Sequence, residues 1–172
     1  MIELRLPTAV DKDDVLAFRD ECLGDARHIP GASNLENYDE YAQWLDACNA
    51  LQRGVSEKNY VPADQYLAYD SESQRLVGMI QLRHSLNDYL RDYGGHIGYT
   101  VRPTERRKGY GGQIVRACLN KARLLGLSRA LITCDDTNLA SEALIRKCGG
   151  IYDDTRIDSS GIPKKRFWIT LN

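Results

Sequence analysis

The sequence has no surplus of either charge. It holds 23 Lys and Arg against 24 Asp and Glu, which gives a net charge of -1. A chain balanced in this way has no overall electrostatic attraction to nucleic acid or to a membrane surface. It also lacks any apolar run near the ~20 residues of a membrane span, and its start, MIELRLPTAV, lacks the layout of a signal peptide. We therefore expect a soluble, cytoplasmic protein with no nucleic-acid partner and no membrane partner.

Paired cysteines are missing as well. The five cysteines are spread along the chain, with no C-x-x-C spacing and no histidine cluster beside them. Such a scattered, odd-numbered set is typical of reduced thiols and offers neither a disulfide framework nor a zinc site. We expect a reducing compartment and no bound metal.

No repeat, low-complexity tract or linker interrupts the 172 residues, so we predict a single domain over residues 1–172. The order of predicted elements indicates an α+β or α/β fold with a mixed sheet and a parallel β-α-β unit in its second half. Apolar periodicity predicts strands at 2–6, 65–70, 75–84, 96–101, 130–134, 151–157 and 166–171. Helices are predicted within 8–23, 37–53, 111–125 and 138–148, with loops at 25–34 and 85–95.

Glycine is concentrated directly after the predicted strand at 96–101, in the stretch ERRKGYGGQ at 105–113. The first N–H groups of a helix are unpaired and lie at its positive end, so a glycine turn here favours phosphate binding. The stretch lacks the G-K-[ST] of a nucleotide-triphosphate loop, and Ile114 stands where G-x-G-x-x-G needs its last glycine. Taken alone, it is either a cradle for an anion or a solvated basic turn.

Two motifs together resemble the GCN5-related N-acetyltransferase (GNAT) superfamily. The first is R-x-x-G-x-G, between a strand and an amphipathic helix, which is similar to the family's pyrophosphate-binding motif. The second is N-x-x-[AS]-x-x-L with a glycine five residues later. The resemblance covers about 76–152 well, and the opening strand and helix at 1–24, and it is closest to a bacterial subgroup of predicted acetyltransferases. The residues that carry it are Arg106, Gly109, Gly111, Asn138, Ser141, Leu144 and Gly149.

The resemblance implies a GNAT-like fold, with a mixed, mostly antiparallel sheet of six to seven strands, about four helices and a central β-α-β unit for acetyl-CoA. It also implies direct transfer of an acetyl group, in a ternary complex, to a primary amine of a small molecule or peptide. Family members are often homodimers. The cofactor-binding residues that it implies are Tyr99, Thr100, Val101, Arg106, Arg107, Lys108, Gly109, Tyr110, Gly111, Gly112, Asn138 and Ser141.

The same resemblance suggests catalytic groups. A backbone N–H near Tyr99 or Thr100 would polarise the thioester carbonyl. His96 is the first candidate for the base that deprotonates the amine, and His84 is the second. Each also has a structural interpretation, for His96 a bond to the loop backbone. His28 is interpreted as a surface residue in a loop that can border the acceptor site.

One position departs from the family. The usual general acid is a tyrosine, and Ile145 stands in its place. The thiolate then either leaves unaided or takes its proton from a group such as Tyr99 or Tyr152, whereas Cys148 is interpreted as a small core residue. The departure keeps a second hypothesis open, a catalytically silent module that binds acyl-CoA. A third is a nucleic-acid or anion patch on an unrelated protein.

Acidic residues are frequent in the segments that would flank an acceptor cleft. They can attract a cationic amine, or they form a solvated charged face. The positions are Glu36, Asp39, Glu40, Asp88 and Asp92.

Overall fold

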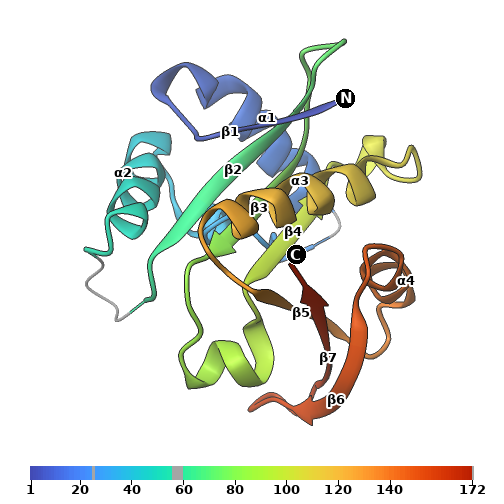
Figure 1. Cartoon of the computed structure of the whole chain (residues 1–172). Coiled ribbons are helices and arrows are strands. Elements are labelled where there is room, and N and C mark those ends of the chain that lie inside the picture. The colour runs from blue at the N-terminus through green and yellow to red at the C-terminus, as the bar shows by residue number, and fades with distance from the viewer. Residues whose placement is uncertain (25, 56–59, 172) are drawn as a thin grey trace.

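The computed structural model describes residues 1–24, 26–55 and 60–171, and over these it has a seven-stranded sheet in the order β1-β2-β3-β4-β5-β7-β6 (Figure 1). Neighbouring strands are antiparallel except for β4 and β5. The predicted mixed, mostly antiparallel sheet with its helices is confirmed. The strands are β1 (Ile2–Arg5), β2 (Ala63–Asp70), β3 (Leu76–Arg83), β4 (Ile97–Val101), β5 (Arg129–Asp135), β6 (Ile151–Ile157) and β7 (Pro163–Thr170), and the α-helices are α1 (Lys12–Leu23), α2 (Tyr41–Gln52), α3 (Tyr110–Leu124) and α4 (Leu139–Lys147).

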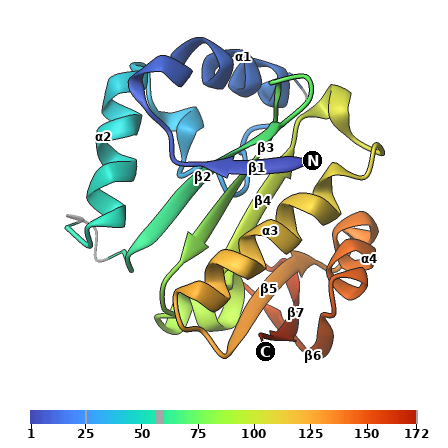
Figure 2. The ribbon, with the colours of Figure 1, turned by 45° about the horizontal axis from the view of Figure 1, so that its top comes forward.

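Helices cover both faces of the sheet, which is why β2 and β3 are buried almost throughout. Successive side chains of a strand point to opposite faces, so Ile80 packs in the core beneath α3 while Met79 packs in the core beneath α1 and α2. Figure 2 shows α3 in front of the strands, with α1 and α2 at the top and left of the molecule. The core under α3 also includes Ile132 of β5 and Phe167 of β7, so it joins the two halves of the sheet.

Three local predictions need correction. Val10 falls within the predicted helix at 8–23 but is 91% exposed, because it lies in a short 3₁₀ turn, Ala9–Asp11, before α1. The helix predicted within 37–53 begins later, at Tyr41, with Glu40 at the N-cap position of α2, since Leu35–Asn37 forms a 3₁₀ turn of its own. The predicted loop at 85–95 contains one π-helical turn, η3 (Leu90–Gly94).

Glu21 ties the end of α1 to the turn that follows β4. Its carboxylate accepts hydrogen bonds from Arg102 Nε at 2.6 Å and from the backbone N–H and hydroxyl of Thr104 at 2.8 and 2.7 Å. Burial alone would raise the pKa of this carboxyl, but the bonds from Arg102 and Thr104 outweigh it and lower the pKa from 4.5 to about 2. The link fixes where the glycine-rich turn begins.

Replacing Glu21 by Gln is expected to destabilise the protein at neutral pH. Because the pKa of Glu21 is lowered on folding, the charge stabilises the fold above about pH 4.5, and this contribution is lost as the pH falls toward about 2. Allowing for solvent screening, we expect a loss on the order of 2 kcal/mol at pH 7 and clearly less at pH 3. Urea unfolding at both pH values measures the loss, with Glu3→Gln, a change at an exposed position of β1, as the control. An equal loss at both pH values would contradict this account.

Candidate functional site

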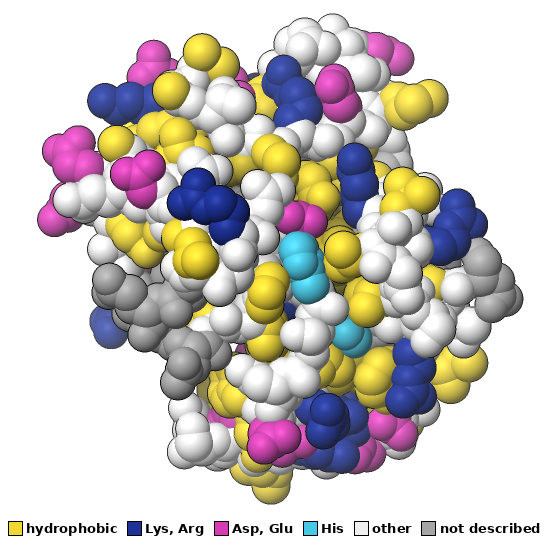
Figure 3. Space-filling view, turned by 60° about the vertical axis from the view of Figure 1, so that its left-hand side comes forward, with side chains coloured by type: hydrophobic (Ala, Val, Ile, Leu, Met, Phe, Trp, Pro, Cys, Tyr) yellow, Lys and Arg dark blue, Asp and Glu magenta, His cyan; other side chains and the backbone are white. Residues whose placement is uncertain are grey.

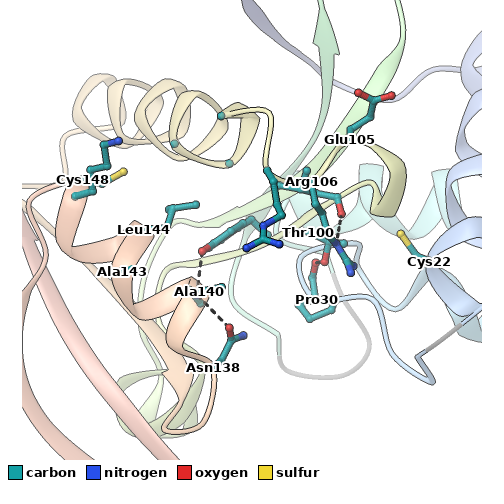
Figure 4. A pocket seen from close by; sticks show the side chains of 18 of the residues that line it. Cys22, Pro30, Thr100, Glu105, Arg106, Asn138, Ala140, Ala143, Leu144 and Cys148 are labelled. Atoms are coloured by element: carbon teal, nitrogen blue, oxygen red, sulfur yellow. Dashed lines mark hydrogen bonds between the residues drawn. The ribbon is translucent and has the colours of Figure 1, made fainter.

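A cavity of about 990 Å³ opens where β4 and β5 separate. The two strands share one bridging pair, Ile97 with Ile132, and then diverge, as Figure 1 shows. Figure 4 looks into this donor cavity, with Thr100 and Arg106 on one side and Asn138 and Leu144 of α4 on the other. Parts of α1, the 26–30 segment, β4, the glycine-rich turn and α4 therefore meet at one hollow.

The separation leaves the β5-facing edge of β4 without a partner strand beyond Ile97. Arg83 N–H donates to His96 O, and Arg102 N–H donates to Val77 O, so the even-numbered residues of β4 use their backbone groups on β3. By alternation, the backbone groups of Tyr99 and Val101 point toward β5, which has already turned away. Arg106 Nε donates to Val101 O at 3.3 Å. Of the two N–H groups considered from the sequence, that of Tyr99 is therefore the one directed into the gap.

The turn before α3 has the shape that its glycines predict. Gly109 is the N-cap residue of α3 with φ 85°, a left-handed conformation that glycine adopts without strain. Position 111 favours glycine for a different reason, since a Cβ there would lie 2.5 Å from Leu144 Cδ1. The start of α3 can thus lie directly against α4, and its free N–H groups face the donor cavity.

Cations surround this turn, though not all of those predicted. Arg106 and Arg107 line the donor cavity. Lys108 is absent from the described lining, and its Nζ lies 2.9 Å from Glu105 Oε2, so its charge is already paired. Tyr110 is also absent from the described lining, because its ring packs against the core under α3.

Two further cations line the same cavity and were missed from the sequence. Arg116 lies four residues after Gly112 on α3, and Lys147 lies three residues after Leu144 on α4. Residues three or four apart on a helix share a face, so this spacing is the signal that would have found them.

The first turn of α4 connects to β4 through Tyr99. Asn138 caps the helix, its Oδ1 accepting from Ser141 N–H at 3.0 Å, and Ser141 Oγ lies 3.0 Å from Tyr99 Oη. Burial raises the pKa of Tyr99, so its phenol stays protonated near neutral pH. Ile145 is fully buried in the core, and Tyr152 is absent from the described lining. Tyr99 is therefore the phenol that the structure places at the cavity.

The two cysteines at the donor cavity stay in the thiol form. Burial raises the pKa of Cys22 to about 11 and also raises the pKa of Cys148 above its ordinary value. A nucleophilic cysteine needs the thiolate, so neither thiol is suited to form a covalent intermediate near neutral pH.

The geometry favours the structural interpretation of His96. Its side chain is 5% exposed, and its Nδ1 accepts a hydrogen bond from Leu131 N–H at 2.9 Å, which fastens β4 to β5 below their separation. Burial lowers the pKa of His96 to about 4, with Arg83 and Arg129 adding to the effect. His96 lines neither of the two cavities described here.

His84 is also held in place by the fold. Its Nε2 lies 3.1 Å from Asp64 Oδ2, and its backbone N–H donates to Pro62 O at 2.8 Å. It lines neither cavity. Both histidines first considered as the base thus lie outside the described cavity walls.

His28, unlike His84 and His96, lies at the cavities. A second cavity of about 440 Å³ lies beside the first, and His28 and Ile29 line both. His28 Nδ1 is hydrogen-bonded to Glu36 Oε1, and Glu36 is largely buried. A neutral imidazole whose Nδ1–H faces a carboxylate has its lone pair on Nε2, the arrangement of an oriented base. The second cavity is called the acceptor cavity below.

The loop that carries His28 lies directly on β4. Gly31 has φ 73°, and a Cβ there would lie 2.1 Å from Gly98 O. Thr100 Oγ1 donates to Pro30 O at 2.6 Å. These contacts hold the His28 segment at the border of the two cavities.

Among the described residues there is no cluster of His, Cys, Asp and Glu that could hold a metal ion. Over the same residues, no helix is long and apolar enough to span a membrane.

The family described as "Acetyltransferase (GNAT) domain" matches residues 2–151. A search of curated proteins finds no match.

Solved structures share the fold at low sequence identity. An acetyltransferase from Salmonella typhimurium that modifies the N-terminal serine of ribosomal protein L7/L12 is 15% identical, with a TM-score of 0.72 over 99% of this chain and 95% of its own. A dodecameric spermidine N-acetyltransferase from Vibrio cholerae is 15% identical, with a TM-score of 0.69 over 99% and 94%. A candidate acetyltransferase from Salmonella typhimurium, solved with its cofactor acetyl-CoA, is 13% identical, with a TM-score of 0.66 over 99% and 94%.

Proposed function

The chain belongs to the GNAT acetyltransferase family, whose acetyl donor is acetyl-CoA, and on that premise we propose that it acetylates a primary amine of a small molecule or peptide in a ternary complex. One observation carries the proposal. The donor cavity joins the part of β4 that has no partner strand on its β5 side to a glycine turn with Arg106 and Arg107, and the acceptor cavity adjoins it. Acetyl-CoA carries a thioester at one end and a pyrophosphate further along. The β4 edge would bind the first and the glycine turn the second, within one cavity.

The residues fit acetyl-CoA by their chemistry. The N–H groups at the start of α3 and the guanidinium groups of Arg106 and Arg107 match a pyrophosphate, and Gly109 leaves that approach open because no atom lies within 4 Å of its Cβ position. Arg116 and Lys147 extend the positive wall. Asn138 and Ser141, also in the wall, would contact another part of the cofactor.

Three groups of the chain would act on the reacting atoms. Acetyl-CoA supplies a thioester whose carbonyl carbon bonds to the amine nitrogen while its bond to sulfur breaks. The Tyr99 N–H would stabilise negative charge on the carbonyl oxygen. His28 Nε2 would take the proton that the amine loses, with Glu36 stabilising the imidazolium. Tyr99 Oη would donate its proton to the departing sulfur and regain one through Ser141 Oγ or solvent.

Both named acceptors among the structural neighbours are amines. One is the N-terminus of a ribosomal protein and the other is spermidine. They support an amine acceptor for this chain without selecting one. The dodecameric neighbour also supports self-association, which size measurement in solution would test.

The first test is donor binding with release of free thiol. Millimolar acetyl-CoA is expected to raise the melting temperature, and amines are expected to release free CoA. Binding without thiol release from any amine would favour the silent acyl-CoA module, which the buried Ile145 supports. The absence of both binding and release would reject the proposal.

The three adjacent cations of the glycine-rich turn allow a test with a built-in control. Arg106→Ala and Arg107→Ala are each expected to weaken CoA binding about tenfold, the effect of losing one charge-assisted hydrogen bond. Lys108→Ala should change the affinity little, because the Lys108 ammonium is already paired with Glu105. Titration calorimetry with CoA measures all three variants. An equal loss in the Lys108 variant would place the pyrophosphate differently.

A further inference from the structure

The acceptor cavity has an unusual charge. Its described lining holds one permanently charged side chain, Arg83, and no Asp or Glu. Figure 3 shows histidine side chains near the centre of one face of the molecule, one of them beside an acidic side chain and both among apolar and uncharged groups. The nearby carboxylate of Glu36 is turned to His28 and is not part of the described lining. A site built for a polycation would carry the opposite charge.

The guanidinium of Arg83 is held in place but not neutralised. Its Nη1 donates to Gly94 O and Gly95 O, both at 3.1 Å, and no carboxylate pairs with it among residues 1–24, 26–55 and 60–171. Many other arginines of the chain have a carboxylate partner, Arg102 and Arg166 among them. Burial lowers the pKa of Arg83, which reflects the cost of leaving this charge without an anion.

The surroundings of Arg83 are polar and uncharged. On the same face of the sheet, Gln81 Nε2 donates to Ser33 Oγ at 2.7 Å, and Ser33 Oγ donates to Gln65 Oε1 at 2.7 Å. These side chains bond to one another and, through Gln65 Nε2, to backbone carbonyl oxygens such as that of Gly31, so they are fixed in place and do not offset the guanidinium charge. Tyr60 and Tyr89, both partly exposed, also line this cavity.

We propose that the acceptor amine carries a carboxylate that pairs with Arg83, while its amino group is directed toward His28. The inference rests on the proposed acetyltransferase function and names the substrate class of that same site. A free amino acid or a related compact amino acid has both groups. The planar guanidinium can bind a carboxylate through two parallel hydrogen bonds, and the anion supplies the charge that the cavity lacks.

Matched acceptors test the inference directly. Tyrosine, tyrosinamide and tyramine share the same side chain and differ in the group beside the amine, and spermidine represents polycations. Free-thiol release is expected to give kcat/KM for tyrosine about 10- to 100-fold above its amide and above tyramine, the range of a charge-assisted hydrogen bond. Equal or higher rates with tyrosinamide, tyramine or spermidine would overturn the inference while leaving the acetyltransferase function intact. No thiol release with any amine would instead count against that function.

Variants of Arg83 separate recognition from folding. Arg83→Gln should abolish the preference for the carboxylate, bringing the tyrosine-to-tyrosinamide ratio near one, whereas Arg83→Lys should keep part of it. CoA affinity and the melting temperature show whether each variant is folded, and Arg91→Gln, an exposed change on η3, is the matched control. An unchanged ratio in a folded, CoA-binding Arg83→Gln variant would overturn the inference. If Arg83→Gln does not fold, the same ratio measured in Arg83→Lys decides, and an unchanged value there has the same consequence.

Discussion

His28→Ala is expected to lower kcat/KM for the acceptor amine by about 10²- to 10³-fold, within the range found when a general base is removed. The reason is its position, since His28 borders both cavities and its Nδ1 is hydrogen-bonded to Glu36. Steady-state kinetics across pH 6 to 9 is the measurement. CoA affinity, measured separately, is expected to change much less than the rate.

Two further variants sharpen this prediction. Glu36→Gln keeps a hydrogen-bond acceptor for His28 but removes the charge that stabilises the imidazolium, so we expect a smaller loss of about tenfold. Added imidazole should restore part of the activity of His28→Ala. A rate and pH profile equal to those of the unchanged protein would remove His28 as the base.

His96→Gln provides the contrast. Because the pKa of His96 is lowered to about 4, its neutral form stabilises the fold above about pH 6.5, and that contribution is lost as the pH falls toward 4. The variant should lose stability because it lacks the imidazole Nδ1 that accepts a hydrogen bond from Leu131 N–H. In the fraction that stays folded, the form of the pH–rate profile between 6 and 9 should be retained, and loss of its pH-dependent limb would restore His96 as a candidate base.

The fold, and the glycine-rich turn that lies at the donor cavity, could be predicted because their signals are local. A strand, a glycine turn and an amphipathic helix follow one another within 96–125. The first N–H groups of a helix are unpaired in any tertiary context, so their ability to bind an anion can be predicted from sequence. The capping role of Asn138 is also local, since its Oδ1 accepts from Ser141 N–H. Lys108 was assigned to the cofactor because sequence does not show that Glu105 already pairs with it.

The acceptor side could not be predicted because its contacts are distant in sequence. His96 is a structural residue or a base depending on where Leu131 lies, which only the register of β4 against β5 decides. The loop that carries His28 has no periodic spacing of apolar residues. Ser33 and Asn34 in it adopt backbone conformations with positive φ, which the sequence pattern does not predict. The acidic side chains that were interpreted either as attracting an amine or as a solvated face are absent from the described lining of the acceptor cavity.

Gly31→Ala is expected to destabilise the protein by about 3 kcal/mol or more, lowering the melting temperature by roughly 10 °C. Two costs combine. The left-handed φ of 73° disfavours any side chain, and the new Cβ would lie 2.1 Å from Gly98 O and 2.6 Å from Tyr99 N, which are backbone atoms fixed in the sheet. Thermal or urea unfolding measures the loss.

Gly126→Ala separates the two costs. Gly126 has φ 93°, but nothing lies within 4 Å of its Cβ position, so this variant carries the backbone strain without the clash and should lose only about 1 kcal/mol. The difference between the variants is then the cost of lifting the loop at 28–31 from β4. Since His28 and Ile29 form the border between the cavities, the part of Gly31→Ala that remains folded should lose amine turnover more than CoA binding. Equal stability losses in the two variants would show that the loop does not rest on Gly98, and the position assigned to His28 would fall with it.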